Sequence, residues 1–274
     1  MLRSSNPILS KKDAFTPAAP QYGTPAGGYG AVPYGQQGYS GYPGGTGYAP
    51  AEAPEDRMTF DDVVTKTAIT MAILIASAAL AWMFVPAPLY FPALILSALV
   101  GFGVVLLVAV RRNISPGLVL VYAAIEGVFI GMISKYFETY YEGIVVQAVI
   151  GTFAAAGVTL AAYKFFNIRV TPTFRKWVIA AMFGFVALSL MDVVLGLFGA
   201  SFGFNGFGGM GFVSSLIGLG LGVLMLILDF DYVERGIAAG LPERESWRAA
   251  FGLTVTIIWI YIELLRLLAI LRGE

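Results

Sequence analysis

The sequence predicts an all-α polytopic membrane protein, with seven transmembrane helices in residues 58–274. Hydrophobic residues make up 58% of the chain and charged residues 12%, whereas roughly 25% of the residues of a soluble domain are charged. Seven apolar stretches lie between Lys66 and Leu271. Each is long enough to cross a hydrocarbon core about 30 Å thick, which takes ~20 helical residues. Ionisable residues inside such stretches are costly, so they are the first candidates for function.

The composition also excludes several kinds of metal site and catalytic group. The chain has no cysteine, which excludes disulfides, zinc knuckles, thiol nucleophiles and iron–sulfur ligation. It has no histidine either, so the commonest metal ligand and general base is missing. The formal net charge is zero and gives no bias towards nucleic acid. We expect no nucleic-acid partner and no cofactor, and any proton chemistry must use Asp, Glu, Lys, Arg or Tyr.

Residues 1–57 differ in composition from the rest of the chain. From Pro17 to Pro54 the sequence consists mainly of Gly, Pro, Ala, Gln and spaced Tyr residues. Because it lacks the aliphatic residues needed to bury a core, we expect this tail to be disordered. It is either a simple tether or a segment that binds a partner.

The apolar stretches and the turn residues between them place the seven spans. Asp61 and Asp62 predict a helical turn leading into the first span, since acidic side chains suit a helix N-terminus. Pro86, Pro88 and Pro92 predict a very tight first connection. We place the spans at residues 66–85, 88–110, 116–135, 143–163, 176–199, 212–233 and 249–271.

The sequence also predicts a helix start and several loops between the later spans. Ser115 followed by Pro116 is typical of an N-cap and a first helical residue. Pro172 and Pro242 are expected in loops. Residues 202–212 (FGFNGFGGMGF) are expected to form a Gly/Phe loop able to dip into the membrane interface.

Lysine and arginine gather in alternate connections and predict the orientation. One side carries Arg57, Lys66, Arg111, Arg112, Lys164, Arg169, Arg175, Lys176, Arg235, Arg244 and Arg248. The connections on the other side hold only Lys135, beside Glu138 and Glu142. By the positive-inside rule the N-terminus is cytoplasmic and the C-terminus outside. Seven spans also require that the two ends lie on opposite sides.

Two intramembrane acids lie alone within their spans. Glu126 is near the middle of the third span, with Tyr122 one turn away and within reach of a hydrogen bond. It is either a proton or cation site or a protonated carboxyl that joins helices. Asp192 in the fifth span shares a face with Ser189 and Gly196, a pattern typical of close helix packing. We interpret Asp192 as structural first and as a secondary functional candidate.

Asp229 and Asp231 close the sixth span. Two residues on a helix are ~200° apart, so these carboxylates cannot share a face. We expect one to face the bundle and the other to face headgroups or water, and Asp229 is the inward candidate. Arg111 and Arg112 end the second span at the same depth, which suggests a carboxylate–guanidinium latch. The alternative is an ordinary interfacial ion pair, worth little where water reaches it.

The seventh span carries one continuous polar stripe. Its members recur at spacings of three and four: Gly252, Thr256, Trp259, Glu263 and Arg266. The charges of Glu263 and Arg266 can neutralise each other as helical neighbours. Such a stripe must face protein or water, so we expect the last helix to be buried in the bundle and to line any path through it.

Three segments together resemble the bacterial Bax inhibitor-1/YccA-like family, the transmembrane BAX-inhibitor-motif proteins. They begin at Ser115 (SPGLVLVYAAIEG), Leu226 (LILDFDYVERG) and Trp259 (WIYIELLRLL). The resemblance covers about residues 58–274. It implies six helices around a central last one, a bacterial plasma membrane location, and the activity of a pH-sensitive calcium leak channel.

The resemblance also implies site residues. In the family, an acid on the sixth span and an acid on the last span share a proton, and a second-span arginine latches the cytoplasmic mouth. The sixth-span acid corresponds to Asp229 or Asp231, and the latch to Arg111 or Arg112. Aligning Leu264-Leu265-Arg266 with the family's ending puts Thr256 at the position of the last-span acid. Glu263 is the nearest acid on that face, two turns away.

These residues suggest three functions. The first is a cation pathway gated by protonation of Asp229, Asp231, Glu263 or Glu126, with calcium suited to oxygen ligands. The second is a non-conducting regulator whose tail binds a membrane protease or a stress-response partner. The third is an intramembrane aspartyl protease, but the Gly-x-Gly-Asp motif of that class is absent before Asp229. We therefore expect no enzymatic activity.

Overall fold

The computed structural model describes residues 56–111 and 114–273, so nearly all of the tail predicted to be disordered lies outside the described residues. Within these ranges seven helices are long and apolar enough to span a membrane. They are α1 (Phe60–Phe84), α2 (Tyr90–Val110), α3 (Pro116–Tyr140), α4 (Ile144–Phe165), α5 (Pro172–Leu197), α6 (Gly209–Ala238) and α7 (Glu245–Gly273); a short 3₁₀ turn, η1 (Ala87–Leu89), precedes α2. The predicted all-α polytopic membrane fold is confirmed.

Several helices begin before the apolar stretch that predicted them. α1 starts at Phe60 rather than at residue 66, because Thr59 and Asp62 form a reciprocal cap. The Asp62 backbone N–H donates to Thr59 Oγ1 at 3.2 Å, and the Thr59 N–H donates to Asp62 Oδ2 at 3.1 Å. The predicted acidic turn is therefore continuous with the first span.

Pro172 is the first residue of α5 and does not lie in a loop. A proline at this position loses no helical hydrogen bond. Thr171 caps the helix by accepting a hydrogen bond from the Phe174 N–H at 3.2 Å. Similarly, α6 begins at Gly209, inside the segment predicted to be a Gly/Phe loop.

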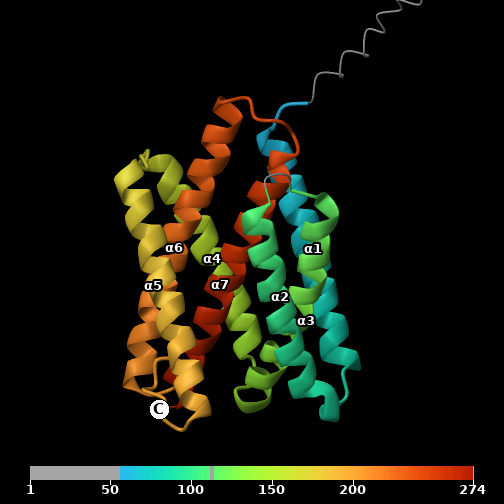
Figure 1. Ribbon diagram of the computed structural model, residues 1–274, viewed down its shortest axis with the longest axis vertical. Helices are drawn as coiled ribbons and strands as arrows, with labels where there is room; N and C mark the ends of the chain where they lie inside the picture. Colours follow the sequence, from blue (N-terminus) through green and yellow to red (C-terminus); the bar gives the residue numbers. More distant parts are fainter. Residues whose placement is uncertain (1–55, 112–113, 274) are drawn as a thin grey trace, which may run out of the picture. The chain divides into compact units, whose positions relative to one another are not determined.

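The last helix lies inside the bundle. α7 packs against α1, α3, α4 and α6, and Figure 1 shows it between the pair α5 and α6 and the group α1, α2 and α3. Its Trp259 ring lies 5.5 Å from the Phe185 ring of α5. Its Phe251 lines one cavity together with Val108 of α2. α7 therefore packs against α1, α3, α4 and α6, lies near α5 through the Trp259 and Phe185 rings, and shares a cavity wall with α2.

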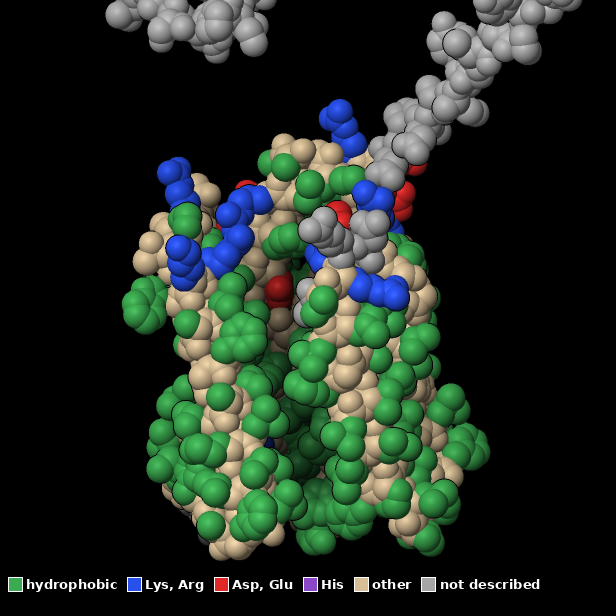
Figure 2. All heavy atoms as spheres, viewed as in Figure 1, with side chains coloured by type: hydrophobic (Ala, Val, Ile, Leu, Met, Phe, Trp, Pro, Cys, Tyr) green, Lys and Arg blue, Asp and Glu red, His purple; other side chains and the backbone are tan. Residues whose placement is uncertain are grey.

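One end of the bundle is rich in positive charge. The N-terminal ends of α1, α3, α5 and α7 lie there, together with the α2–α3, α4–α5 and α6–α7 connections (Figure 1). We call this the basic end, and the end with the C-terminus the opposite end. Lys and Arg side chains gather at the basic end in Figure 2.

The start of α1 is tied to the α6–α7 connection at the basic end. Arg57 pairs with Pro242 in an isolated antiparallel bridge. Lys66, predicted to flank the first span, is only 8% exposed. Its Nζ forms an ion pair with Glu243 at 2.6 Å and lies 5.8 Å from the centre of the Trp247 ring. Burial of this lysine is thus matched by a carboxylate and an aromatic face.

Glycines let α3 approach α1 closely. A Cβ at Gly127 would collide with the Leu74 carbonyl, and one at Gly131 would collide with the Ala78 carbonyl. Both obstacles are backbone atoms, which cannot rotate away. The α1–α3 contact therefore follows the pattern of membrane helices that pack through small residues four positions apart.

Replacing Gly131 by alanine is expected to destabilise the protein by about 1–3 kcal/mol, the usual cost of overpacking. Its thermal unfolding midpoint in lipid nanodiscs should fall. Gly157→Ala on α4 is the matched control, because a Cβ there meets nothing within 4 Å. Alanine is favoured over glycine inside a helix by about 0.5–1 kcal/mol, so the control should be unchanged or more stable. Equal shifts in the two variants would contradict the close α1–α3 contact.

Candidate functional site: a polar seam between α6 and α7

The polar stripe predicted on the last helix faces α6. We call this contact the polar seam. It joins Gly252, Thr256, Trp259, Glu263 and Arg266 of α7 to Asp229, Gly218, Ser215 and Ser214 of α6. Because lipid offers no hydrogen bonds, these polar groups find their partners in the neighbouring helix.

Asp229 lies at the part of the seam nearest the basic end. Thr256 Oγ1 donates a hydrogen bond to Asp229 Oδ2 at 2.6 Å. A Cβ on Gly252 would lie 3.2 Å from Asp229 Oδ1, so the glycine leaves room for the carboxylate. Among the described residues, no lysine or arginine forms an ion pair with Asp229.

The Asp229 carboxylate lines a cavity of about 260 Å³ between α2, α6 and α7. Val108, Phe251 and Arg248 also line it. Figure 2 shows a hollow between two groups of helices, with an acidic side chain visible in it below the charges of the basic end. A carboxylate with a hydroxyl donor, in a cavity near a basic rim, can bind a proton or a cation.

The structure tests one of the two predicted latch arginines. Arg111 forms no ion pair with Asp229, and Arg112 lies outside the described residues. Among the described residues, Arg248 is the arginine that lines the Asp229 cavity. Arg248 pairs with Glu245 at 2.8 Å, and its Nη2 donates to the Arg111 carbonyl at 3.4 Å. It therefore joins the start of α7 to the end of α2.

Arg248 was predicted only as one of the basic residues that set the orientation in the membrane, and not as a residue of the site. It precedes Gly252 by four positions and Thr256 by eight, so it continues the α7 stripe by one turn. Tyr232, one turn after Asp229, lines the same cavity and donates to Glu245 Oε2 at 3.1 Å. Extending the helical spacing backwards from the stripe would have found Arg248.

Asp231 faces a different helix. Its Oδ2 pairs with Arg175 at the start of α5 at 2.9 Å, and also with Arg235 one turn along α6. Asp231 is only 7% exposed, so the expectation that it faces headgroups or water is wrong. The two arginines neutralise the carboxylate where it is buried, and this ties α5 to α6.

Glu263 and Arg266 occupy the part of the seam towards the opposite end. Their predicted pairing is present, at 3.2 Å between Arg266 Nη2 and Glu263 Oε2. Arg266 also donates to Ser215 Oγ at 2.6 Å and to Ser214 Oγ at 2.9 Å. A Cβ on Gly218 would lie 2.7 Å from the Glu263 carboxyl. Both charges are thus enclosed by small residues of α6.

Glu126 lies apart from the seam. Its carboxylate faces α2, where a Cβ on Gly101 would lie 2.5 Å from Glu126 Oε2. Within the described part of the chain no hydrogen bond joins it to Tyr122, whose ring instead packs 4.9 Å from that of Phe251. No group of three or more acidic side chains able to hold a metal ion is found in residues 56–111 and 114–273.

Asp192 organises the α5–α6 connection. Its Oδ1 accepts hydrogen bonds from Ser201 Oγ at 2.8 Å and from the backbone N–H groups of Phe202 and Gly203 at 2.8 and 3.1 Å. Its Oδ2 accepts from the Asn205 N–H at 2.8 Å. A carboxylate engaged four times by one loop has a structural role.

Comparison with known families agrees with this architecture. A family model described as "Bax inhibitor 1 like" matches residues 6–273. The chain belongs to the Bax inhibitor 1-like family. The match begins well before residue 58, so the resemblance extends into the tail, beyond the range that the three segments indicated. No curated protein matches the chain.

For a member of the Bax inhibitor 1-like family, the contact of Asp229 with Thr256 is informative. The resemblance left Asp229 and Asp231 as alternatives for the sixth-span acid, opposite the last-span position held here by Thr256. Only Asp229 touches Thr256, while Asp231 turns towards α5. Of the two candidates, Asp229 therefore contacts the last-span position that the resemblance singles out, and that position carries a hydroxyl instead of a carboxyl.

Asp192→Ala is expected to destabilise the α5–α6 connection by about 3 kcal/mol, since backbone donors lose a charged acceptor. Limited proteolysis should cut the variant faster within residues 198–208. Asp61→Ala, at an exposed position of the first turn of α1, is the control and should leave cleavage there unchanged. Unaltered proteolysis of the Asp192 variant would contradict the structural role.

Arg266→Met is expected to cost about 3–5 kcal/mol, because it leaves the Glu263 carboxylate buried without its cation. Adding Glu263→Gln should restore part of the lost thermal stability by removing the unpaired charge. Arg272→Met, an exposed residue that donates to the Glu142 carbonyl at 2.8 Å, should change stability by only about 0.5 kcal/mol. Additive losses in the double variant would contradict the coupling of the two charges.

Proposed function

We propose that this Bax inhibitor 1-like protein conducts cations, with calcium as the transported ion, and that Asp229 is the group that senses pH. The proposal places the protein in the bacterial plasma membrane. The basic end faces the cytoplasm, in line with the positive-inside rule, and the C-terminus lies outside. It assigns no catalytic role to any residue.

One observation carries the proposal: the Asp229 carboxylate lines a cavity near the basic end, with a hydroxyl donor and no cation partner among the described residues. Asp192, Asp231 and Glu263 are each engaged by donors or arginines. Glu126 faces α2 instead. An intramembrane acid open to a cavity is the kind that marks an ion or proton path.

Protonation would act through the charge of Asp229. When ionised, its carboxylate supplies the hard oxygen ligand that calcium prefers and draws cations past the basic rim. When protonated, it loses that charge, and its attraction for the Arg248 guanidinium on the same cavity wall weakens as well. Because Arg248 also contacts the end of α2, this change can bias an equilibrium between a closed and an open basic end.

Calcium flux into proteoliposomes tests the proposal. Wild-type flux is expected to fall as the pH is lowered and Asp229 loses its charge. Asp229→Asn should be slow and nearly independent of pH, since the amide is uncharged at every pH. Thr256→Val should keep the carboxylate and its pH response, with a shifted midpoint because one hydrogen bond to the ionised form is lost.

Asp231→Asn is the matched control two residues away. It should lower thermal stability through its arginine pairs but keep the pH dependence of flux. Thermal unfolding of each variant separates lost conduction from lost folding. Equal pH profiles for wild type and Asp229→Asn would contradict the proposal.

The alternative remains a non-conducting regulator that binds a membrane protease or stress-response partner through its tail. Flux no greater than that of empty liposomes at every pH would favour it. Deleting residues 1–57 then distinguishes the two functions: a channel should still conduct, whereas a tail-dependent regulator should lose its partner.

A further inference from the structure

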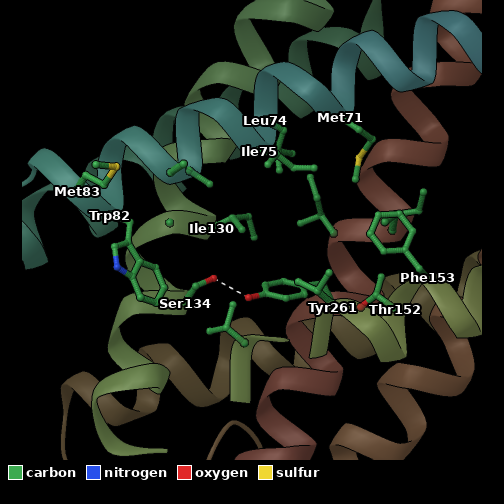
Figure 3. A pocket seen from close by; sticks show the side chains of 17 residues that line it. Met71, Leu74, Ile75, Trp82, Met83, Ile130, Ser134, Thr152, Phe153 and Tyr261 are labelled. Carbon is green, nitrogen blue, oxygen red and sulfur yellow. Dashed lines mark hydrogen bonds between the residues drawn. The ribbon is translucent and has the colours of Figure 1, made fainter. Parts of the chain in front are cut away.

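A second cavity lies between α1 and α4, away from Asp229. Its volume is about 370 Å³, within the range of small-molecule sites. Residues of α1, α3, α4 and α7 line it, and they are almost all apolar. We call it the lateral slot. Figure 3 shows Trp82 and Met83 at one end and Met71 and Phe153 at the other.

The lateral slot is open towards the bilayer. Among the described residues α1 and α4 are not packed against each other, although both line the slot. Its rim residues Ile75, Met83 and Phe153 are 54%, 71% and 54% exposed. All four helices that form its walls are candidate membrane spans. The medium that reaches the slot is therefore lipid.

The shape of the slot suits an extended chain. Its α1 wall runs from Met71 to Met83, a distance of about 18 Å for twelve helical rises of 1.5 Å. It therefore follows the helix axis over more than half of a hydrocarbon core about 30 Å thick. The main polar feature of its wall is the hydrogen bond between Ser134 Oγ and the Tyr261 hydroxyl, 2.6 Å long. These hydroxyls satisfy each other and leave the slot apolar.

A positive charge lies at the Trp82 end of the slot. Lys135 follows Ser134 on α3, and its Nζ donates to the Trp82 carbonyl at 2.8 Å. An ammonium has three donors, so others remain for an anion. The nearby Glu138 is engaged by the N–H groups of Gly143 and Val145 at 2.7 and 3.1 Å. A lysine and a tryptophan at this level are typical of the membrane interface.

We propose that the lateral slot binds a phospholipid of the surrounding bilayer, with one acyl chain between α1 and α4 and the phosphate at Lys135. The apolar walls exclude a headgroup from the slot itself, while the lysine supplies the matching charge at its end. This site is separate from the Asp229 cavity, so its test does not depend on conduction.

The test is photo-crosslinking of the full-length protein in phosphatidylcholine proteoliposomes. A minor fraction of phosphatidylglycerol carries a diazirine on one acyl chain, and labelled peptides are mapped by mass spectrometry. Ile257 of α7 is half-buried and lines the slot. We expect label on the α7 segment around Ile257, which a lipid merely surrounding the protein would not reach.

Two variants and one control variant make the test more specific. Ala79→Phe overfills the slot and should reduce label on α7 about tenfold. Ala76→Phe is the matched control, since Ala76 is exposed on the same helix and does not line the slot; it should leave the label unchanged. Lys135→Gln should reduce labelling by the phospholipid but not by a diazirine fatty alcohol, which has no phosphate.

Label spread evenly over all lipid-facing helices, or equal α7 label in Ala79→Phe and Ala76→Phe, would overturn the proposal. Absence of α7 label from a protein that purifies as a dimer would assign the slot to a second copy of the chain and would also overturn it.

Discussion

The bundle depends on one constraint: a polar group within the membrane must find its partner in protein, because lipid supplies none. The α7 stripe meets this constraint along its length against α6, from Asp229 and Thr256 to Arg266 and the two serines. The small residues Gly218, Ser214 and Ser215 of α6 make room for these larger polar groups. Burial of α7 and close packing of α6 are therefore two results of the same requirement.

The two parts of the polar seam differ in how their charges are balanced. Glu263 has Arg266 one turn away, and that arginine is held by two hydroxyls. Asp229 has a hydroxyl donor and an adjoining cavity. Glu263 therefore has a charged partner within the seam, whereas Asp229 has a hydroxyl donor and an open cavity. The proposed role of Asp229 in gating rests on this difference.

The acidic residues within the membrane spans differ in their partners, and geometry separates them. Asp192 holds a loop through four hydrogen bonds, Glu138 receives the N–H groups at the start of α4, and Asp231 fastens α5 to α6. An intramembrane acid is generally expected to be functional. Here that expectation is best applied to the acids that have few hydrogen-bond donors and no ion-pair partner. By that criterion Asp229 stands out among the acids near α6 and α7.

The sequence by itself determined the number of spans and the polar stripe of α7, because apolar length and helical spacing are local properties. Helix ends were less well predicted, since polar caps such as Thr59 and the proline at residue 172 extend helices beyond their apolar cores. Only the tertiary structure decided that Asp229 faces Thr256, that Asp231 is buried against Arg175, and that Arg248 lines the cavity. The lateral slot also had no signal in the sequence. These features depend on how helices far apart in the chain rotate and pack against one another, and the pattern within one helix does not encode its neighbours.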